Sequence, residues 1–411
     1  MMNSNQIFEL GLGLSAPWYI KESKLTKSTL QQRGQLDIYV DFHAGSKFSD
    51  EDNKECSVYD TEERKWQHLN FFEHTCFIHA RVPRIVRSDG KVRTISVPWA
   101  RAGSGFTLLF EAFSMLLIEN EMPVNKVAST LRVVAHRLWR VFNYWVKDAV
   151  DKDCLAGVTE IGIDETSAKK GHDYVTVCAD LDKRRVIHVS EGREADTVKE
   201  IVHTIAAKGG KAENITHVAI DMSPSYISGV MTHLPEAKIV FDKFHIVAML
   251  NKTMDDLRKA ERKEIDMLKG HKYTVLYRYE KLSPKKRNDL DYLLLAYPRL
   301  GEAYRLKELF GTFWEIKNKE EAMAFLTFWC DYVLDTDINP FKQFVKTLKA
   351  HWSGIINYIE AQINTGIMEG INNKIQLAKR RARGYRNTEN YINMIYFIAG
   401  KLKFSYPHYP S

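Results

Sequence analysis

The sequence predicts a multidomain α/β protein whose central domain is a mixed sheet flanked by helices. Three runs rich in β-branched residues follow one another between residues 160 and 189, which is typical of an antiparallel meander. Two further strand-like runs, at 217–220 and 238–241, alternate with helical segments, and the order β-β-β-α-β-α-β-α indicates a mixed α/β domain. From residue 244 to about 363 the pattern is helical throughout, which predicts an all-α insertion into this domain.

The composition favours a folded protein with an anionic partner. The 411 residues suffice for two or three domains, and an apolar content of 45% argues against global disorder. The net charge of +7 and the pI near 8.9 mildly favour nucleic acid as a partner. The five cysteines are scattered without a CxxC pair, and the chain has neither a signal-peptide pattern nor an apolar run of about 18 residues. We therefore expect a cytoplasmic protein that does not enter a membrane.

The N-terminal third divides into an arm and a small module. Residues 1–35 are polar and punctuated by glycine and proline, so we expect a poorly packed arm. Residues 36–103 contain strand-like runs at 36–40, 71–82 and 93–97, and we expect a small β-rich module. Its core is expected to consist of Phe71, Phe72, Phe77, Ile78, Val82 and Trp99.

At Phe106 the spacing of apolar residues becomes helical. Residues 104–155 contain an apolar helix over 106–122, a second helix that begins at Pro123, and a third helix from residue 135. A helix, a tight turn and a basic helix form the arrangement of a helix-turn-helix DNA-binding domain. An ordinary helical hairpin is the alternative. The expected DNA contacts on the basic helix are His136, Arg137 and Arg140.

The first part of the catalytic domain is expected over 156–250, where two carboxylates stand at strand ends. Asp164 follows the apolar positions of the first strand, which is expected to be central, and Asp221 ends the fourth. An ionised carboxylate on a central strand requires a partner, a metal or solvent. A surface aspartate that caps its strand is the alternative for Asp164. Strands in this order with acids at their ends fit a ribonuclease-H-like sheet.

After the helical insertion, expected over 251–350, residues 351–411 return to the catalytic domain. A new helix begins after Gly366 and carries Glu369 near its start. Its far end is strongly basic, which suits contact with DNA phosphates, although a solvated cluster is the alternative. The expected DNA contacts in this segment are Lys374, Lys379, Arg380, Arg381, Arg383 and Arg386.

Asp164, Asp221 and Glu369 form the kind of acidic set that phosphodiester chemistry requires. Two magnesium or manganese ions held about 3.5–4 Å apart by carboxylates activate the attacking oxygen and stabilise the leaving one. Because the chain has 52 acidic residues, many such triples exist. Asp242 is an alternative third carboxylate, since it also ends a strand, and Glu165 and Asp180 are lesser alternatives.

Four stretches together resemble the DDE transposases of bacterial insertion sequences, specifically the ISL3 family: GIDETSAKKGHDYVTVCADLD, HVAIDMSPSY, IVFDKFHIVAMLN and MEGINNKIQLAKRRARGYRN. The similarity continues upstream through WQHLNFFEHTCFIHARVPR and VPWARAGSGFTLLFEAF, and so covers the chain from about residue 36. It implies a zinc-finger-like module, a helix-turn-helix, and a ribonuclease-H-like domain interrupted by helices. It places the catalytic, metal-binding acids at Asp164, Asp221 and Glu369, with Asp242 and His245 in a motif beside the site.

The N-terminal module departs from the family pattern. Members similar to this chain usually carry paired cysteines, but Ser49, Asp50 and Asp52 stand in the place of the first pair. Only Cys56 and Cys76 remain nearby, so bound zinc is doubtful. If these cysteines still form a site, His68 could complete it.

The resemblance implies a transposase that binds the terminal inverted repeats of its element as double-stranded DNA. It would cut the ends with metal-activated water and join them to target DNA, with His245 orienting substrate or a metal-bound water. A buried structural histidine is the alternative for His245. A homodimer or higher oligomer on DNA, associated with the bacterial nucleoid, is expected. The competing hypotheses are a catalytically inactive DNA-binding repressor and a ribonuclease-H-like nuclease without strand transfer.

Overall fold

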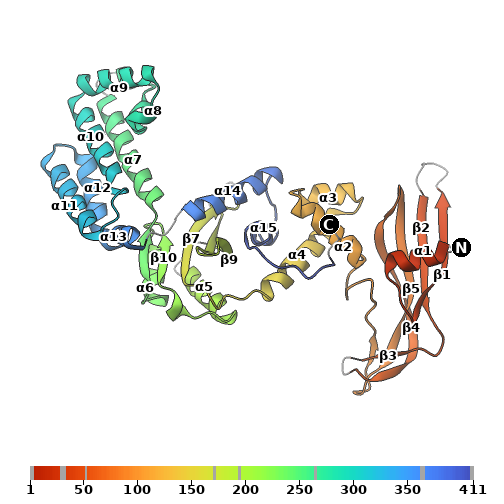
Figure 1. Cartoon of the computed structure of the whole chain (residues 1–411). Helices are drawn as coiled ribbons and strands as arrows, with labels where there is room; N and C mark the ends of the chain where they lie inside the picture. Colours follow the sequence, from red (N-terminus) through yellow and green to blue (C-terminus); the bar gives the residue numbers. More distant parts are fainter. Residues whose placement is uncertain are drawn as a thin grey trace. The chain divides into compact units, whose positions relative to one another are not determined.

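The computed structural model describes residues 4–27, 34–50, 53–169, 173–192, 196–262, 266–361 and 366–407. The chain forms two compact units (Figure 1). The first comprises residues 1–152 together with 378–383 and 402–411, and the second comprises 153–377 and 384–401. The β-rich module and the three predicted DNA-binding helices therefore belong to the same unit.

The first unit contains, in its described part, a six-stranded sheet in the order β1-β2-β5-β4-β3, with β6 paired to β5. Neighbouring strands are antiparallel except β2 and β5, which run parallel. The elements that build it are helix α1 (Ser4–Leu12) and strands β1 (Trp18–Lys27), β2 (Gly34–Phe42), β3 (Lys47–Ser49), β4 (Glu55–Phe71), β5 (His74–Val86) and β6 (Val92–Thr94).

The expectation of a poorly packed arm over residues 1–35 is wrong for the described part of that segment. Strand β1 pairs along its length with β2, and its residues Trp18 and Ile20 lie in the core. A hydrogen bond links helix α1 to this strand: Glu9 Oε1 accepts from the Ile20 backbone N–H at 2.8 Å. The sequence did not reveal this strand, because its second half is exposed on both faces and lacks an apolar alternation.

The core of the module differs in part from the expected set. Ile78, Val82 and Trp99 are buried as predicted, whereas Phe71 and Phe72 are exposed at the turn between β4 and β5. The centre of the core is a group of indole rings: Trp99 lies edge-on to Trp18 and to Trp66, with ring centroids 4.9 and 5.7 Å apart. Edge-to-face aromatic pairs of this kind add stability beyond the area they bury.

The helical part of the first unit follows the prediction closely. It contains α2 (Leu108–Glu119), α3 (Val124–Thr130) and α4 (Ala135–Asp151). The Thr107 side chain caps α2 by accepting a hydrogen bond from Phe110 N–H. The apolar face of α4 is buried, including Leu138 and Phe142.

A five-stranded sheet in the described part of the second unit has the order β11-β10-β7-β8-β9. Strands β7, β8 and β9 form the predicted antiparallel meander, and β10 and β11 run parallel to β7. The prediction that Asp164 lies on a central strand is confirmed, but its expected place at a strand end is wrong, because β7 continues past Asp164 to Ser167 in register with β8. The strands are β7 (Glu160–Ser167), β8 (Tyr174–Asp180), β9 (Arg185–Glu191), β10 (His217–Ile220) and β11 (Lys238–Phe241).

Helices α5 and α6 connect the later strands of this sheet, and the described part of 243–361 consists of helices joined by short loops. The helices are α5 (Asp196–Ala207), α6 (Pro224–His233), α7 (Lys243–Arg262), α8 (Lys272–Leu276), α9 (Pro284–Ala296), α10 (Pro298–Phe313), α11 (Lys319–Asp335), α12 (Asn339–Ala350), α13 (Trp352–Ala361), α14 (Gly366–Arg381) and α15 (Thr388–Ala399). Buried aromatics in α10 and α11, including Phe310 and Trp329, lie in the core of the helical stretch.

Candidate active site and DNA-binding elements

Three aspartates stand level with one another on adjacent strands of the second sheet. In the parallel pairing of β10 with β7, Ala219 lies opposite Gly162, so Asp221 continues the register beside Asp164. In the pairing of β10 with β11, Ile220 lies opposite Phe241, and the Asp242 N–H donates to Ile220 O at 3.1 Å. Because neighbouring strands are about 4.8 Å apart, Asp164, Asp221 and Asp242 form one row at the ends of β10 and β11. We call these three residues the carboxylate row.

Asp164 is held by hydrogen bonds at both carboxylate oxygens. Its Oδ1 accepts a hydrogen bond from Glu165 N–H at 2.8 Å, and its Oδ2 accepts one from Asn372 Nδ2 at 2.7 Å. The pKa of Asp164 is raised, first by burial and further by the charges of Asp242 and Asp221, while the Glu165 N–H and His245 act in the opposite direction. The carboxylate row thus concentrates negative charge where it is partly shielded from water.

Helix α14 lies along β7 in a fixed register (Figure 1). Asn372 contacts Asp164, and one helical turn later Gln376 Nε2 donates to Thr166 Oγ1 at 2.7 Å. One turn earlier, Met368 Sδ lies 2.8 Å from where a Cβ on Gly162 would be. Four residues along the helix span about 6.0 Å, and two residues along the strand span about 6.6 Å. Successive contacts between the two elements therefore stay aligned.

No sequence signal identified Asn372. In the structure Asn372 faces the strand, whereas its neighbour Asn373 is exposed. Ile371 and Ile375 are buried and form an apolar stripe. The spacing of four from Asn372 to Gln376, beside that stripe, is the signal that could have indicated a polar contact with the sheet.

Glu369 lies in the first turn of α14 with an exposed side chain, three residues before Asn372. Within the described residues, no group of three or more His, Cys, Asp or Glu side chains is arranged to hold a metal ion. The donor chemistry nevertheless fits magnesium, which prefers carboxylate oxygens, and a dication would favour the ionised form of Asp164, whose pKa is raised by burial and further by the neighbouring carboxylates. The choice between Glu369 and Asp242 as the third metal ligand stays a prediction.

His245 lies in the first turn of α7, beside the carboxylate row. Its Nε2 is 3.9 Å from Asp242 Oδ2, and its side chain is 43% exposed. This exposure disfavours the alternative of a buried structural histidine. His245 is therefore accessible to a molecule that approaches the carboxylates.

The exposed face of α4 carries two of the three predicted DNA contacts. His136 and Arg140 are exposed and lie one helical turn apart. Arg137 is half-buried: its guanidinium carbon lies 4.2 Å from the centroid of the Phe106 ring, and Nη2 donates to Gly105 O at 3.4 Å. Burial lowers the pKa of Arg137, and the charge of Arg140 adds to this effect. The structure thus gives Arg137 a packing role that the sequence analysis did not anticipate.

A buried acid organises the helices around α4, and no sequence signal identified it. Glu111 is fully buried in α2. It accepts hydrogen bonds from Arg101 Nε at 2.8 Å, Ser104 Oγ at 2.5 Å and Trp145 Nε1 at 2.8 Å. A buried carboxylate requires such donors, so these contacts tie the loop before α2 to the middle of α4.

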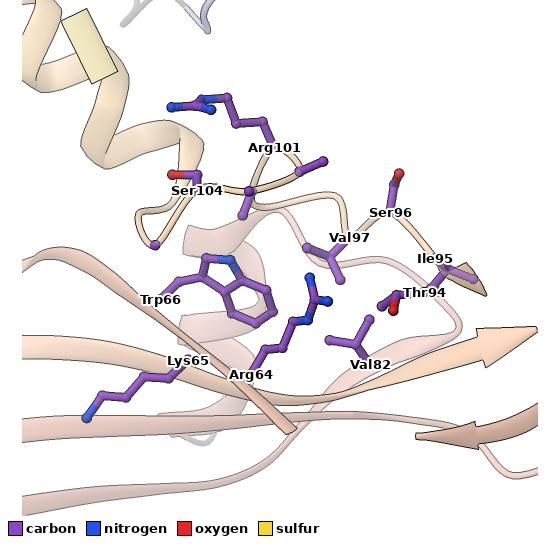
Figure 2. A pocket seen from close by; sticks show the side chains of 14 residues that line it. Arg64, Lys65, Trp66, Val82, Thr94, Ile95, Ser96, Val97, Arg101 and Ser104 are labelled. Carbon is purple, nitrogen blue, oxygen red and sulfur yellow. The ribbon is translucent and has the colours of Figure 1, made fainter. Parts of the chain in front are cut away.

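The β-rich module and the helices are joined by the backbone. Gln67 N–H on β4 donates to Gly105 O at 2.9 Å, and Thr107 N–H donates to Gln67 O at 3.1 Å. A pocket of about 320 Å³ lies where this loop meets the sheet. Figure 2 shows Arg64 and Trp66 from β4 on its wall, with Arg101 and Ser104 from the loop. None of the carboxylate row lines this pocket.

The basic segment lies at the C-terminal end of α14 and just beyond it. Lys374, Arg380, Arg383 and Arg386 are exposed, whereas Lys379 is half-buried and burial lowers its pKa. Arg381 forms an ion pair with Glu121 at 2.5 Å within the first unit, to which residues 378–383 belong. Of the six predicted DNA contacts, the freely accessible charges are therefore Lys374, Arg380, Arg383 and Arg386.

Of the residues considered as zinc ligands, Cys56 is too far from the other two to share an ion with them. Cys56 and His68 lie 12 positions apart on the same strand, β4, which corresponds to about 40 Å. Cys76 is buried beside His68, and burial raises the pKa of its thiol to about 12. Burial also lowers the pKa of His68 to about 4, and its Nδ1 lies 2.8 Å from Thr107 Oγ1.

Comparison with known protein families decides the class of this chain. A family model described as a transposase matches residues 161–395, which is more than half of the chain. A second model, described as the helix-turn-helix domain of transposase family ISL3, matches residues 95–146. The chain belongs to the ISL3 family of transposases. The sequence-based assignment to this family is confirmed.

Individual relatives of this transposase agree with the family assignment. The transposase for insertion sequence element IS1001 from Bordetella parapertussis is 27% identical over 365 residues, which cover 86% of this chain and 89% of that protein. The transposase for insertion sequence element IS1557 from Mycobacterium tuberculosis is 26% identical over 359 residues, 79% of each chain. A solved simian T-cell lymphotropic virus intasome in complex with PP2A regulatory subunit B56 gamma is 11% identical, covering 44% of this chain and 66% of that one. Its TM-score of 0.17 is too low to support a statement about the fold.

The chain is thus a transposase that acts on DNA, and the repressor and nuclease hypotheses are not favoured. The DDE family implies dependence on a divalent metal. None of the described helices combines the length and the apolar character that a membrane span requires.

Proposed function

We propose that this transposase binds the terminal inverted repeats of its own insertion sequence, cleaves the strand at each end, and joins the freed 3′-hydroxyl to target DNA. The observation that carries the proposal is the carboxylate row on β7, β10 and β11, with α14 docked beside it. This site occurs in a chain that also has an accessible basic face on α4. Cleavage and DNA reading are therefore assigned to separate units of one protein.

The order β11-β10-β7-β8-β9 supports a ribonuclease-H-like catalytic domain. We assign this domain to residues 156–250 and 351–411, with 251–350 as its helical insertion. The N-terminal module and the helix-turn-helix, over 36–103 and 104–155, would read the repeats. Because residues 378–383 group with the first unit, the basic end of α14 would serve DNA binding as well.

Asp164 and Asp221 would hold divalent metal ions, magnesium or manganese and most simply two of them, with Glu369 as the third ligand and Asp242 as its rival. When bound, such ions activate an attacking oxygen and stabilise the leaving oxygen of a phosphodiester. His245, exposed beside Asp242, would orient the scissile phosphate or the attacking water. The accessible cations of the basic segment would hold the flanking DNA backbone.

Cleavage breaks the bond between phosphorus and the 3′ oxygen at the element end, and water supplies the new oxygen on phosphorus. In strand transfer, the freed 3′-hydroxyl attacks a phosphodiester of the target, and the displaced target oxygen leaves as a 3′-hydroxyl. Two ends must be brought together before joining, so we propose at least a dimer on DNA. The reaction would take place in the bacterial cytoplasm, at the nucleoid.

The test is a reaction of the purified full chain with a DNA fragment that carries both ends of its element, a target plasmid and Mg²⁺. Sequenced junctions that join the element's 3′ ends to target DNA are the expected product. Cleaved ends without junctions would favour the nuclease hypothesis. End-specific binding without cleavage would favour the repressor.

A further inference from the structure

Asn372 makes one hydrogen bond at the site and leaves its other polar atom buried. Its Nδ2 donates to Asp164 Oδ2 at 2.7 Å. Its Oδ1 is buried and accepts no hydrogen bond from any described residue. A buried oxygen without a hydrogen-bond donor is destabilising, and a water molecule or a bound ligand commonly supplies the missing donor.

We propose that Asn372 is the positioning residue for Asp164, and that its Oδ1 accepts a hydrogen bond from a water bound to the catalytic cation. This inference rests on the proposed function, because it assumes that Asp164 is a metal ligand. It assigns a role to a residue on α14 other than Glu369.

The geometry explains why an amide suits this position. The Asp164 carboxylate is fixed at both oxygens, by Glu165 N–H at Oδ1 and by Asn372 at Oδ2, so its plane cannot rotate freely. A lysine or arginine would also hold Oδ2, but its charge would neutralise the carboxylate and compete with the cation. The neutral amide orients Asp164 and leaves its charge available. Residues that orient metal ligands in this way typically contribute 10–100-fold to metal affinity or activity.

A hydrogen bond from a metal-bound water suits the buried Asn372 Oδ1 better than direct coordination of magnesium would. Magnesium releases its waters reluctantly and commonly keeps several of them in protein sites. A metal-bound water is a hydrogen-bond donor, and Asn372 Oδ1 is an acceptor on the same amide that holds Asp164. The cation, its water, Asn372 and Asp164 would then close a ring of interactions.

The chain offers two matched controls on the same helix. Gln376 docks α14 to Thr166 in the same way but does not contact Asp164. Asn373 is the same residue type at the next position and is exposed. A purely structural role for Asn372, the docking of α14, predicts that loss of Gln376 has a similar effect. A positioning role predicts that only loss of Asn372 affects the metal.

The experiment measures Mn²⁺ binding to the full chain without DNA, by calorimetry or by the electron paramagnetic resonance of free Mn²⁺. The variants are N372A, the near-isosteric N372L, N373A, Q376A and D164N, each checked for the wild-type thermal unfolding temperature. We expect N372A and N372L to weaken Mn²⁺ binding by about 10–100-fold, and N373A and Q376A by less than about threefold. D164N should abolish binding at this site.

Three outcomes would overturn the inference. If Q376A weakens binding as much as N372A, Asn372 only docks the helix. If N372A and N372L bind Mn²⁺ like the wild type while D164N does not, Asp164 is a ligand but Asn372 does not position it. If D164N itself binds Mn²⁺ like the wild type, the proposed metal site fails and the role of Asn372 fails with it.

Discussion

Asn372 Nδ2 donates a hydrogen bond to Asp164 Oδ2 at 2.7 Å, and this contact sets the register of α14 along β7. The next contact, Gln376 to Thr166, follows one helical turn later on the same strand face. Glu369 precedes Asn372 by three residues on the same helix, so the same register fixes its position along the strand. A shift of α14 by one turn would therefore separate Asn372 from Asp164 and move Glu369 by the same amount.

The first prediction separates Arg140 from Arg137. Arg140 is exposed on α4, so R140A should lower the preference for element ends by about 1–3 kcal/mol, the typical contribution of an arginine contact to a base. R137A should instead lower the thermal stability of the helix-turn-helix, because Arg137 packs on Phe106. Competitive gel-shift titrations of end and scrambled DNA, with thermal unfolding of each variant, check both effects. Equal loss of end preference in both variants would show that Arg137 also reaches the bases.

The second prediction concerns the basic segment. R380A and R383A should weaken binding to every DNA sequence, and each lost phosphate contact should flatten the slope of log K against log salt by about 0.9. R381A should change the slope less, because Arg381 is paired with Glu121. Fluorescence anisotropy with random duplexes over a range of salt concentrations measures these slopes. Unchanged slopes in R380A and R383A would indicate that the segment does not contact DNA.

The third prediction is a loss of stability in mild acid. Burial lowers the pKa of His68 to about 4, whereas an unfolded histidine titrates near 6.5. Above about pH 6.5 His68 is neutral in both the folded and the unfolded chain, so burying it carries no protonation penalty. Between about pH 6.5 and 4 the unfolded chain gains a proton that folded His68 does not, so the free energy of unfolding falls, by roughly 3 kcal/mol at most.

Urea unfolding of the wild type and of H68Q, at pH 7.5 and pH 4.5, tests this effect. Glutamine preserves a polar contact with Thr107 but does not titrate, so H68Q should lose less stability on acidification. His188, whose pKa is also lowered to about 4 by burial, remains in both proteins and supplies the same background. An identical pH dependence in the two proteins would exclude His68 as the cause.

The fourth prediction is that the β-rich module folds without zinc. Cys56 lies far from the adjacent pair His68 and Cys76, and the core consists instead of Trp18, Trp66 and Trp99. Elemental analysis of protein purified without chelator should find less than stoichiometric zinc, C56S should unfold like the wild type, and W99A should destabilise the module by about 3–5 kcal/mol. One tightly bound zinc per chain, released as the module unfolds, would contradict this account.

The sequence predicted the parts of the fold that have a strong local pattern. Strands β10 and β11 were predicted at their observed bounds, because three consecutive apolar residues are followed by an aspartate in each case. Strand β4 was not predicted, because residues 59–65 are mostly exposed and show no apolar alternation. Asp221 directly follows β10 as predicted, whereas Asp164 lies within β7, whose polar second half gave no sign that the strand continues to Ser167.

The other parts of the site depend on long-range register, which no local pattern contains. The contact of Asn372 with Asp164 joins residues 208 apart in sequence, and Asn373 beside it looks equivalent in the sequence. The buried Glu111 resembles any surface glutamate until its three donors are brought together by the fold. Only the tertiary structure distinguishes these residues from their neighbours.

The fifth prediction concerns the carboxylates themselves. D164N, D221N and E369Q should each lower the rate of end cleavage by about 10²–10⁴-fold while leaving DNA affinity unchanged, because neutral amides are poor magnesium ligands. D242N is the decisive comparison, since Asp242 lies in the carboxylate row and Glu369 does not. If cleavage survives E369Q but is lost in D242N, Asp242 is the third ligand.

The most direct test of the central claim is Mg²⁺-dependent cleavage of an end-labelled duplex that carries the element's terminal repeat, by the wild type and by D164N. The account predicts a cut at the repeat end that requires Mg²⁺, is abolished by chelator and is absent in D164N, with equal gel-shift affinity for the two proteins. Wild-type cleavage by D164N, or a cut that persists in chelator, would contradict it.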